Sequence, residues 1–214
     1  MNMVAMPELV QGTADWLQIR CGKLTASRVA EALAKTKSGW GAGRDNVMAQ
    51  LIAERLTGQP METYTNAAMQ WGTATEPQAR EAYAAATFYT VTQVGFVHHP
   101  TIEGFGCSPD GLVEDDGLVE VKCPNTATHI DTLLALSIPE KYITQVQAQM
   151  SCTGRQWTDF VSFDPRMPEN MRLFVKRVYR DDAAIKKMEA DIADFLEQLH
   201  KKVTALRVKY GSVK

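Results

Sequence analysis

The sequence predicts an α/β or α+β domain in which helices flank a mixed central β-sheet. The order of the predicted elements supports this class, because helices come first, then a run of strands with one helical insertion, then a long closing helix. The chain has 214 residues, of which 45% are hydrophobic and 22% charged, which suits one sizeable globular domain. The sequence contains no evident linker or internal repeat, so we expect residues 1–214 to form a single domain.

The first 90 or so residues are predicted to be mainly helical. Capping residues and apolar spacing favour helices over residues 16–20, 25–35, 45–56 and 66–86, the last with a break near Trp71. Residues 35–44 are rich in glycine and cations, which predicts an exposed, mobile loop. This loop lacks the Gly-Lys-Ser/Thr ending of a phosphate-binding P-loop, so that motif is excluded.

The second half of the chain supplies the expected sheet. Alternating apolar residues predict strands over 91–98, 156–163 and 171–178, together with two short paired strands within 107–124. Helices are expected over residues 126–136 and 139–152. The closing helix is expected over residues 181–206 because its apolar residues keep helical spacing, and a basic tail follows to residue 214.

Charge and composition exclude several classes of protein. The net charge of -2 gives no global sign of nucleic-acid binding. No apolar run reaches the ~18–20 residues that span a bilayer, and the first residues lack a signal-peptide pattern, so we expect a cytoplasmic protein without a membrane partner. The four cysteines form no Cys-x-x-Cys pair, which argues against zinc or iron–sulfur ligation and favours free thiols.

Residues 107–124 carry the clearest chemical pattern. Asp110 lies in the first of the two paired strands, and residues 118–122 of the second read Leu-Val-Glu-Val-Lys. A period of two puts Leu118, Glu120 and Lys122 on one face of that strand, with Val119 and Val121 on the other. Burying such a set of charges without a partner or a metal costs several kcal/mol. A metal site would account for the pattern.

Magnesium suits these residues. Mg²⁺ prefers carboxylate and carbonyl oxygens, so Asp110 and Glu120 can share one ion and the backbone carbonyl of Val121 can add a third oxygen. Lys122 can orient or deprotonate the attacking water, or stabilise negative charge on the phosphate. The set suits phosphodiester hydrolysis. Taken alone, however, the pattern does not separate this site from an alternating Glu/Lys strand at a solvated sheet edge.

Further blocks of sequence add a family resemblance. In its order and spacing of motifs, the chain resembles the lambda-exonuclease, or YqaJ-type viral recombinase, branch of the PD-(D/E)xK nuclease superfamily. The resemblance covers about residues 10–180. The matching blocks are residues 16–20, 24–27, 71–76 with 79–80, 107–112, 120–124, 145–147 and 163–167.

The resemblance implies a restriction-endonuclease-like fold and an enzyme that acts on ends of double-stranded DNA. It implies a Mg²⁺-dependent 5′→3′ exonuclease, with Mn²⁺ as a substitute and two ions per site. The product would be a 3′ single-strand overhang for phage-type recombination in a bacterial host. The resemblance also implies a homotrimer ring around DNA and a single-strand annealing recombinase as partner.

The same resemblance assigns roles to single residues. Asp110, Glu120 and Lys122 match the catalytic core of the family. Glu76 matches an acidic residue that helps to order metal or water, although a carboxylate in the first turn of a helix is also favoured by the helix dipole. Gln145 matches a glutamine beside the active site, and is otherwise an ordinary residue on an exposed helix face.

DNA-contacting residues are implied in the same way. The terminal 5′-phosphate pocket is matched by Arg20, Ser27 and Ser108, while Thr128 replaces a family arginine and leaves His129 as its substitute. Three further residues are expected to contact DNA, namely Trp16, the apolar wedge Met69 and the groove-tracking cation Lys37. Ordinary surface, capping and packing roles remain open for each of them.

Two alternative functions remain open at this point. One is a structure- or site-specific endonuclease on the same fold, which covalently closed circular DNA would distinguish because an end-dependent enzyme leaves it intact. The other is a non-catalytic DNA-end-binding protein, against which the complete set of ionisable residues argues.

Overall fold

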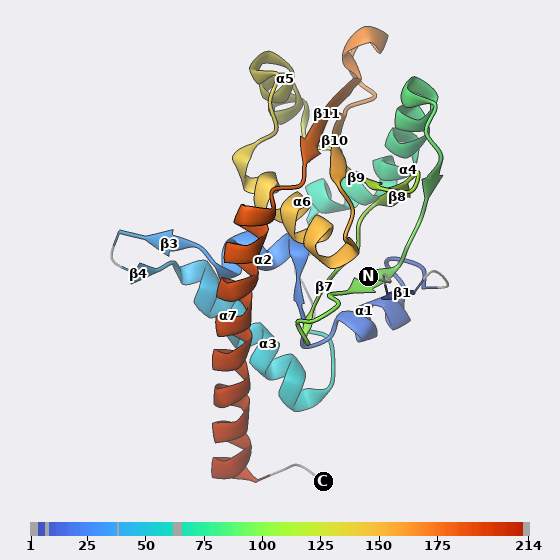
Figure 1. The fold of residues 1–214 in the computed structure, drawn as a ribbon. Helices are drawn as coiled ribbons and strands as arrows, with labels where there is room; N and C mark the ends of the chain where they lie inside the picture. Colours follow the sequence, from blue (N-terminus) through green and yellow to red (C-terminus); the bar gives the residue numbers. More distant parts are fainter. Residues whose placement is uncertain (1–3, 7–8, 38, 62–65, 212–214) are drawn as a thin grey trace.

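The computed structural model describes residues 4–6, 9–37, 39–61 and 66–211 (Figure 1). The helices have the following bounds: α1 Ala14–Arg20, α2 Ala26–Ala32, α3 Ala42–Thr57, α4 Ala67–Thr87, α5 Thr126–Ala135, α6 Glu140–Thr153 and α7 Asp182–Tyr210, with a 3-10 turn at Glu169–Met171. The strands are β1 Val4–Met6, β2 Leu24–Thr25, β3 Lys35–Thr36, β4 Gly39–Trp40, β5 Val91–Thr92, β6 Phe96–His98, β7 Phe105–Cys107, β8 Gly111–Val113, β9 Gly117–Lys122, β10 Trp157–Phe163 and β11 Leu173–Tyr179.

The central sheet is mixed and flanked by helices, which confirms the predicted fold class. Its five strands follow the order β11-β10-β9-β8-β5. Strands β9 and β10 pair in parallel, whereas the other neighbours are antiparallel. The long closing helix is also confirmed, and α7 runs down one side of the molecule in Figure 1. Strand β9, which carries Glu120 and Lys122, therefore lies in the middle of the sheet.

The prediction of one strand over residues 91–98 is wrong, because the chain divides there between two sheets. Strand β5 lies at the edge of the central sheet, whereas β6 belongs to a second sheet of order β1-β6-β7-β2. Two side chains donate hydrogen bonds to the backbone carbonyls between these strands. Gln11 donates to Val94 O at 2.8 Å, and Trp16 donates to Gly95 O at 3.0 Å. A Cβ on Gly95 would lie 2.0 Å from Leu9 O, so only glycine allows this close approach.

Two apolar clusters cover the two faces of β9. Leu118 packs with residues of α6, among them Ala148 and Met150, in one cluster. Val119 and Val121 pack with Ala79 and Tyr83 of α4 in the other cluster. The predicted alternation of faces along this strand is confirmed, and burial on both faces is what a central strand requires.

Two local predictions in the first half of the chain are wrong. Helix α4 is continuous through Trp71, since the side chain of Asn66 accepts from Met69 N at 2.9 Å and starts the helix there. The expected loop over residues 35–44 instead contains the short hairpin of β3 and β4, and then Gly41 and the first turn of α3. This hairpin projects away from both larger sheets in Figure 1.

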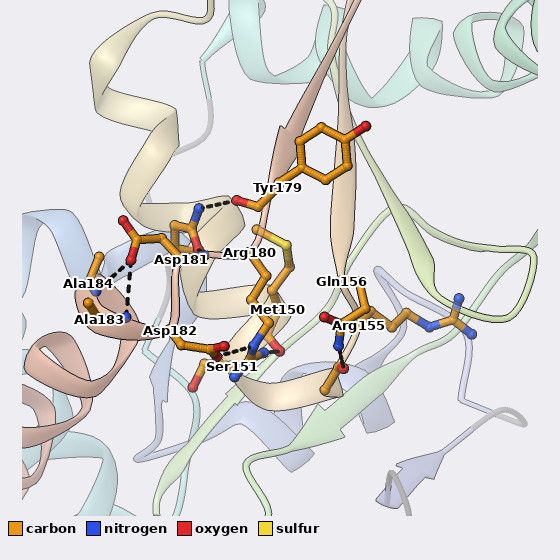
Figure 2. Close-up of polar contacts among 12 residues, drawn as sticks. Met150, Ser151, Arg155, Gln156, Tyr179, Arg180, Asp181, Asp182, Ala183 and Ala184 are labelled. Atoms are coloured by element: carbon orange, nitrogen blue, oxygen red, sulfur yellow. Dashed lines mark hydrogen bonds and ion pairs between the residues drawn. The ribbon is translucent and has the colours of Figure 1, made fainter.

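The junction between β11 and α7 anchors helix α6 (Figure 2). Asp181 caps α7 by accepting from the backbone N–H groups of Ala183 and Ala184, each at 3.0 Å. Arg180 donates to the Met150 carbonyl of α6 and, at 2.6 Å, to the carboxylate of Asp182. Gln147 of α6 joins the same junction, where it donates to the Tyr179 carbonyl at 2.9 Å and accepts from Asp181 N at 3.0 Å. One side of α6 is thus fixed to the last strand and helix.

Within the described part of the chain, no helix combines the length and the apolar character needed to cross a membrane. All four cysteines are free thiols, as predicted, and Cys107, Cys123 and Cys152 are buried.

Candidate active site

Glu120 is the most tightly held side chain of the site. It is 1% exposed and lies on the α6 side of β9, where a carboxylate needs hydrogen-bond donors. Its Oε1 accepts from Gln145 Nε2 at 2.5 Å and pairs with the Lys122 ammonium. Its Oε2 accepts from Gln149 Nε2 at 2.6 Å. Both carboxylate oxygens are therefore fixed by side chains from α6 and from the same strand.

Asp110 lies directly before β8, at the edge of β9. The β8–β9 pairing runs no further than Gly111 opposite Val119, so Val121 has no strand partner on that edge. The side chain of Asp110 occupies the position of the missing strand partner and accepts a hydrogen bond from Val121 N at 2.6 Å. Burial and the nearby charge of Glu120 raise the pKa of Asp110 well above its usual range, although Lys122 acts in the opposite direction.

Lys122 supplies the cation of the site. Burial alone would lower the pKa of its ammonium group, but the nearby charges of Glu120 and Asp110 outweigh burial and hold that pKa above its usual value. Lys122 is therefore protonated at neutral pH. In this state it can stabilise negative charge, and it cannot accept a proton from water.

Glu76 lies on the other flank of the site, on α4. Its side chain is 31% exposed and forms an ion pair with Arg80, one turn later. Burial raises the pKa of Glu76; Arg80 opposes this shift and the charge of Glu120 adds to it. The negative charge of Glu76 thus acts on Asp110 and Glu120. However, Glu76 is not among the described residues that line the pocket around these two carboxylates.

A pocket of about 170 Å³, which we call the acidic pocket, joins most of the predicted residues. Its lining residues are Gln11, Trp16, Arg20, Thr25, Ala26, Ser27, Ser108, Asp110, Glu120, Lys122, Gln145 and Gln149. The structure therefore brings four of the five predicted catalytic residues together with three of the four predicted phosphate ligands. Arg20 and Ser27 were predicted from sequence blocks other than those that carry the catalytic residues.

Arg20 and its neighbours form the basic wall of this pocket. The guanidinium of Arg20 stacks 3.8 Å above the ring of Trp16, and burial lowers its pKa to about 10. It makes no hydrogen bond or ion pair within the part of the chain that the structure describes. Trp16 is fixed by a hydrogen bond from its Nε1 to Ser108 Oγ at 2.9 Å, and the hydroxyl of Ser27 lies 3.2 Å from that of Thr25. An arginine that is oriented but unpaired is suited to bind an anion.

A larger cleft of about 800 Å³, the outer cleft, shares Trp16, Arg20 and Ser27 with the acidic pocket. Met69 lines its far side from the first turn of α4 and is 49% exposed. The position is compatible with the expected contact to DNA.

Two predicted residues lie away from both cavities. His129 is fully buried, and its ring nitrogens lie 2.8 Å from Ser162 Oγ and 2.8 Å from the Met171 carbonyl. It is a core histidine between α5 and β10, so the geometry gives it no part in binding a terminal phosphate. Lys37 is exposed in the hairpin of β3 and β4. Thr128 lies in the first turn of α5, where its N–H donates to Asn125.

Sequence reasoning missed Gln149, Gln11 and Thr25 as pocket residues. A signal for Gln149 was present, since it follows Gln145 by four residues on a predicted helix and so lies on the same face. For Gln11 no comparable signal existed. Its amide donates to the carbonyls of Val94 and Pro109, each at 2.8 Å, and these contacts exist only once the two sheets have formed.

The donor set fits a hard divalent cation. Asp110 and Glu120 offer carboxylate oxygens, and burial, followed by the nearby charge of Glu120, holds the pKa of Asp110 above its usual range. Among the described residues there is no group of three or more His, Cys, Asp or Glu side chains able to hold a metal. A cation here would therefore depend on two carboxylates, backbone oxygen and water, which is a common ligand set for Mg²⁺.

Comparisons with known proteins identify the family of this chain. A family model described as the YqaJ-like viral recombinase domain matches residues 15–156. The alkaline exonuclease LHK-Exo from Laribacter hongkongensis is 50% identical over 92% of this chain and 97% of its own, with a TM-score of 0.86, and 0.87 for its complex with dAMP. A phage related exonuclease from Haemophilus somnus 129PT, 15% identical over 86% of this chain and 96% of its own, shares the fold with a TM-score of 0.69. No curated protein gave a match. From the domain match and the 50% identity, the chain belongs to the YqaJ-like viral recombinase family.

Proposed function

We propose that this protein is a metal-dependent exonuclease that degrades the 5′-ended strand of double-stranded DNA in the 5′→3′ direction. One observation carries the proposal: a single pocket joins the Asp110–Glu120–Lys122 set to the guanidinium of Arg20, which has no hydrogen-bond or ion-pair partner among the described residues. The first group suits phosphodiester hydrolysis, and the second suits a terminal phosphate. The relative at 50% identity is named an alkaline exonuclease and was crystallised with dAMP, a nucleoside monophosphate.

Asp110, Glu120 and the carbonyl of Val121 are the proposed metal ligands. In a strand, the N–H and C=O of one residue point to the same edge. The N–H of Val121 donates to Asp110, so its carbonyl faces the edge where Asp110 lies. When bound, two Mg²⁺ ions per site, or Mn²⁺ in their place, would neutralise the carboxylates and polarise the phosphoryl oxygens.

The side chains have separate tasks in this proposal. Lys122 is protonated, so of the roles open to it we assign the stabilisation of charge that builds up on the phosphate. Gln145 holds Glu120 in place through the 2.5 Å hydrogen bond. Glu76, on α4, adds negative charge near the site and helps to order metal or water.

The position of the basic wall supports the proposed polarity. If Arg20, Ser27 and Ser108 bind a terminal 5′-phosphate, the next phosphodiester bond lies toward Asp110 in the same pocket. The outer cleft then receives the duplex end, where Met69 separates base pairs and Trp16 supports Arg20. Contacts to phosphate and to shape carry no sequence information, so we expect no sequence preference. Lys37 remains the proposed groove contact.

Family membership supports the remaining parts of the proposal. We infer a homotrimer ring that encloses DNA, which would prevent the substrate from diffusing away between cuts. We also infer a single-strand annealing recombinase that receives the 3′ overhang during phage-type recombination in the bacterial cytoplasm. These inferences extend the nuclease role of the relatives to this single chain.

An end-labelled digestion tests the activity and its polarity together. Linear duplexes carrying either a 5′-phosphate or a 5′-hydroxyl, labelled at the 5′ or the 3′ end, are incubated with protein and Mg²⁺. We expect early release of the 5′ label, faster cleavage of phosphorylated ends, and no cleavage after chelation of the metal. Covalently closed circles should stay intact. Absence of nucleotide release from the phosphorylated duplex would refute the proposal, and cutting of circles would favour an endonuclease.

A further inference from the structure

Gln149 is a buried amide that none of the roles above uses. It lies on α6, is 1% exposed and lines the acidic pocket. Its Nε2 donates to Glu120 Oε2 at 2.6 Å, while its Oε1 is buried and has no hydrogen-bond partner among the described residues. Burying an acceptor without a donor costs free energy, and buried polar groups in native proteins are nearly always paired.

The orientation of this amide is forced by its neighbour. An ionised carboxylate only accepts hydrogen bonds, so the nitrogen of Gln149 must face Glu120 and the oxygen must point elsewhere. Rotating the amide by half a turn would place two acceptors against each other. Gln145 already occupies the other oxygen of Glu120, so the two glutamines fix the carboxylate from both sides. Of these two glutamines, Gln149 is the one whose amide oxygen is buried without a partner among the described residues.

The chemistry of this oxygen limits what it can bind. A carbonyl oxygen needs a donor, whereas the ionised phosphodiester group has no hydrogen to donate. A water molecule can supply this donor, and water bound to a cation is a stronger donor than bulk water because the ion polarises its O–H bonds.

We propose that Gln149 is a positioning residue that links Glu120 to the hydration shell of the bound cation. Its amide nitrogen fixes the metal-binding carboxylate, and its amide oxygen accepts a hydrogen bond from a cation-bound water. The inference rests on the proposed metal-dependent nuclease function. In this role, Gln149 of α6 contacts the ligands of the metal and not the metal itself. Such contacts commonly tune metal affinity.

Measurements of Mn²⁺ binding test this role without DNA. Electron paramagnetic resonance and the relaxation of water protons report the binding. The variant Gln149→Met keeps the length of the side chain and removes both hydrogen-bonding groups. We expect the affinity for Mn²⁺ to fall by about 10- to 100-fold. In digestion assays kcat should fall, whereas the KM for DNA and the preference for 5′-phosphate should stay as in the wild type.

Gln147→Met is the matched control, because Gln147 lies on the same helix but bonds to the Tyr179–Asp181 junction. It should lower the thermal stability and leave the affinity for Mn²⁺ unchanged. If Gln149→Met does not fold, Gln149→Asn carries the test, since it keeps the cavity polar but is too short to hold Glu120. It should weaken Mn²⁺ binding as well.

Unchanged Mn²⁺ affinity and water relaxation in the folded Gln149 variants would overturn the inference. Equal loss of Mn²⁺ affinity in the Gln147 control would overturn it too, because the effect would then be structural. Failure of the proposed function looks different: the wild-type protein itself would bind no Mn²⁺ or release no nucleotides.

Discussion

Two sets of carboxylates on the same sheet differ in how their charge is balanced. On β10, Asp159 is 2% exposed and receives Arg177 Nε on one oxygen and Arg177 Nη2 on the other, each at 2.8 Å. Tyr83 adds a third hydrogen bond at 2.8 Å, and Arg177 stacks 3.5 Å from the ring centre of Trp157. One carboxylate thus meets one guanidinium, so charge and hydrogen bonds are balanced within the protein.

The Asp110–Glu120 pair, on the neighbouring strand and its edge, is not balanced in this way. Its donors are a backbone N–H, two neutral amides and the single ammonium of Lys122. Hydrogen bonds are supplied, but the ammonium of Lys122 offsets only one of the two carboxylate charges, and the pKa of Asp110 rises as a result of burial and of Glu120. A balanced buried carboxylate stabilises the fold, whereas an unbalanced one marks a place where a cation can bind.

The largest expected difference between the two sets concerns activity. Asp110→Asn removes a proposed metal ligand and should reduce nucleotide release by about 1,000-fold, equivalent to about 4 kcal/mol of transition-state stabilisation. Its thermal stability without metal should stay or increase, because the repulsion between Asp110 and Glu120 is removed. Initial rates and melting temperatures, measured on one preparation, check both parts. If Asp110→Asn were as active as the wild type, the proposed difference between the two sets of carboxylates would be wrong.

Substitution at the balanced set, Asp159 and Arg177, should change the free energy of unfolding instead. Arg177→Met leaves Asp159 buried without its cation, so we expect the free energy of unfolding to fall by about 3–5 kcal/mol. Urea denaturation measures this change. Lys176→Met is the control, because Lys176 is the exposed neighbour on the same strand and should change the free energy of unfolding by less than about 0.5 kcal/mol. Equal effects of the two variants would contradict the assigned role of Arg177.

A further carboxylate, Asp164, gives a smaller, pH-dependent effect. The side chain of Asp164 is fully buried; hydrogen bonds from Arg166, then one from Thr126, lower its pKa to about 2. The folded protein therefore binds this proton less tightly than the unfolded chain, whose pKa is near 3.8. The stabilisation is complete above about pH 4 and is lost as the pH falls toward 2.

Asp164→Asn should thus lower the free energy of unfolding by about 1–3 kcal/mol at neutral pH and flatten its dependence on pH below 4. Denaturation curves at several pH values test this. A variant that keeps the wild-type slope in the acid range would show that another group controls acid unfolding.

The sequence predicted those parts of the protein that depend on local pattern. Alternation along residues 118–122 placed Glu120 and Lys122 on one face, and helical spacing placed the long closing helix. The division between two sheets near Gly95 was missed because it depends on contacts with Leu9 and Trp16, which are remote in sequence. His129 was misassigned for the same reason: its partners Ser162 and Met171 come from later elements.

The central claim is that the unbalanced charge at Asp110 and Glu120 forms a cation site. Calorimetric titration with Mg²⁺ in the absence of DNA tests it most directly, using the wild type, Asp110→Asn and Asp159→Asn, each first verified as folded by circular dichroism. We predict that wild type and Asp159→Asn bind Mg²⁺ with similar affinity, and that Asp110→Asn loses this binding. Retained binding in Asp110→Asn, or its loss only in Asp159→Asn, would contradict the account.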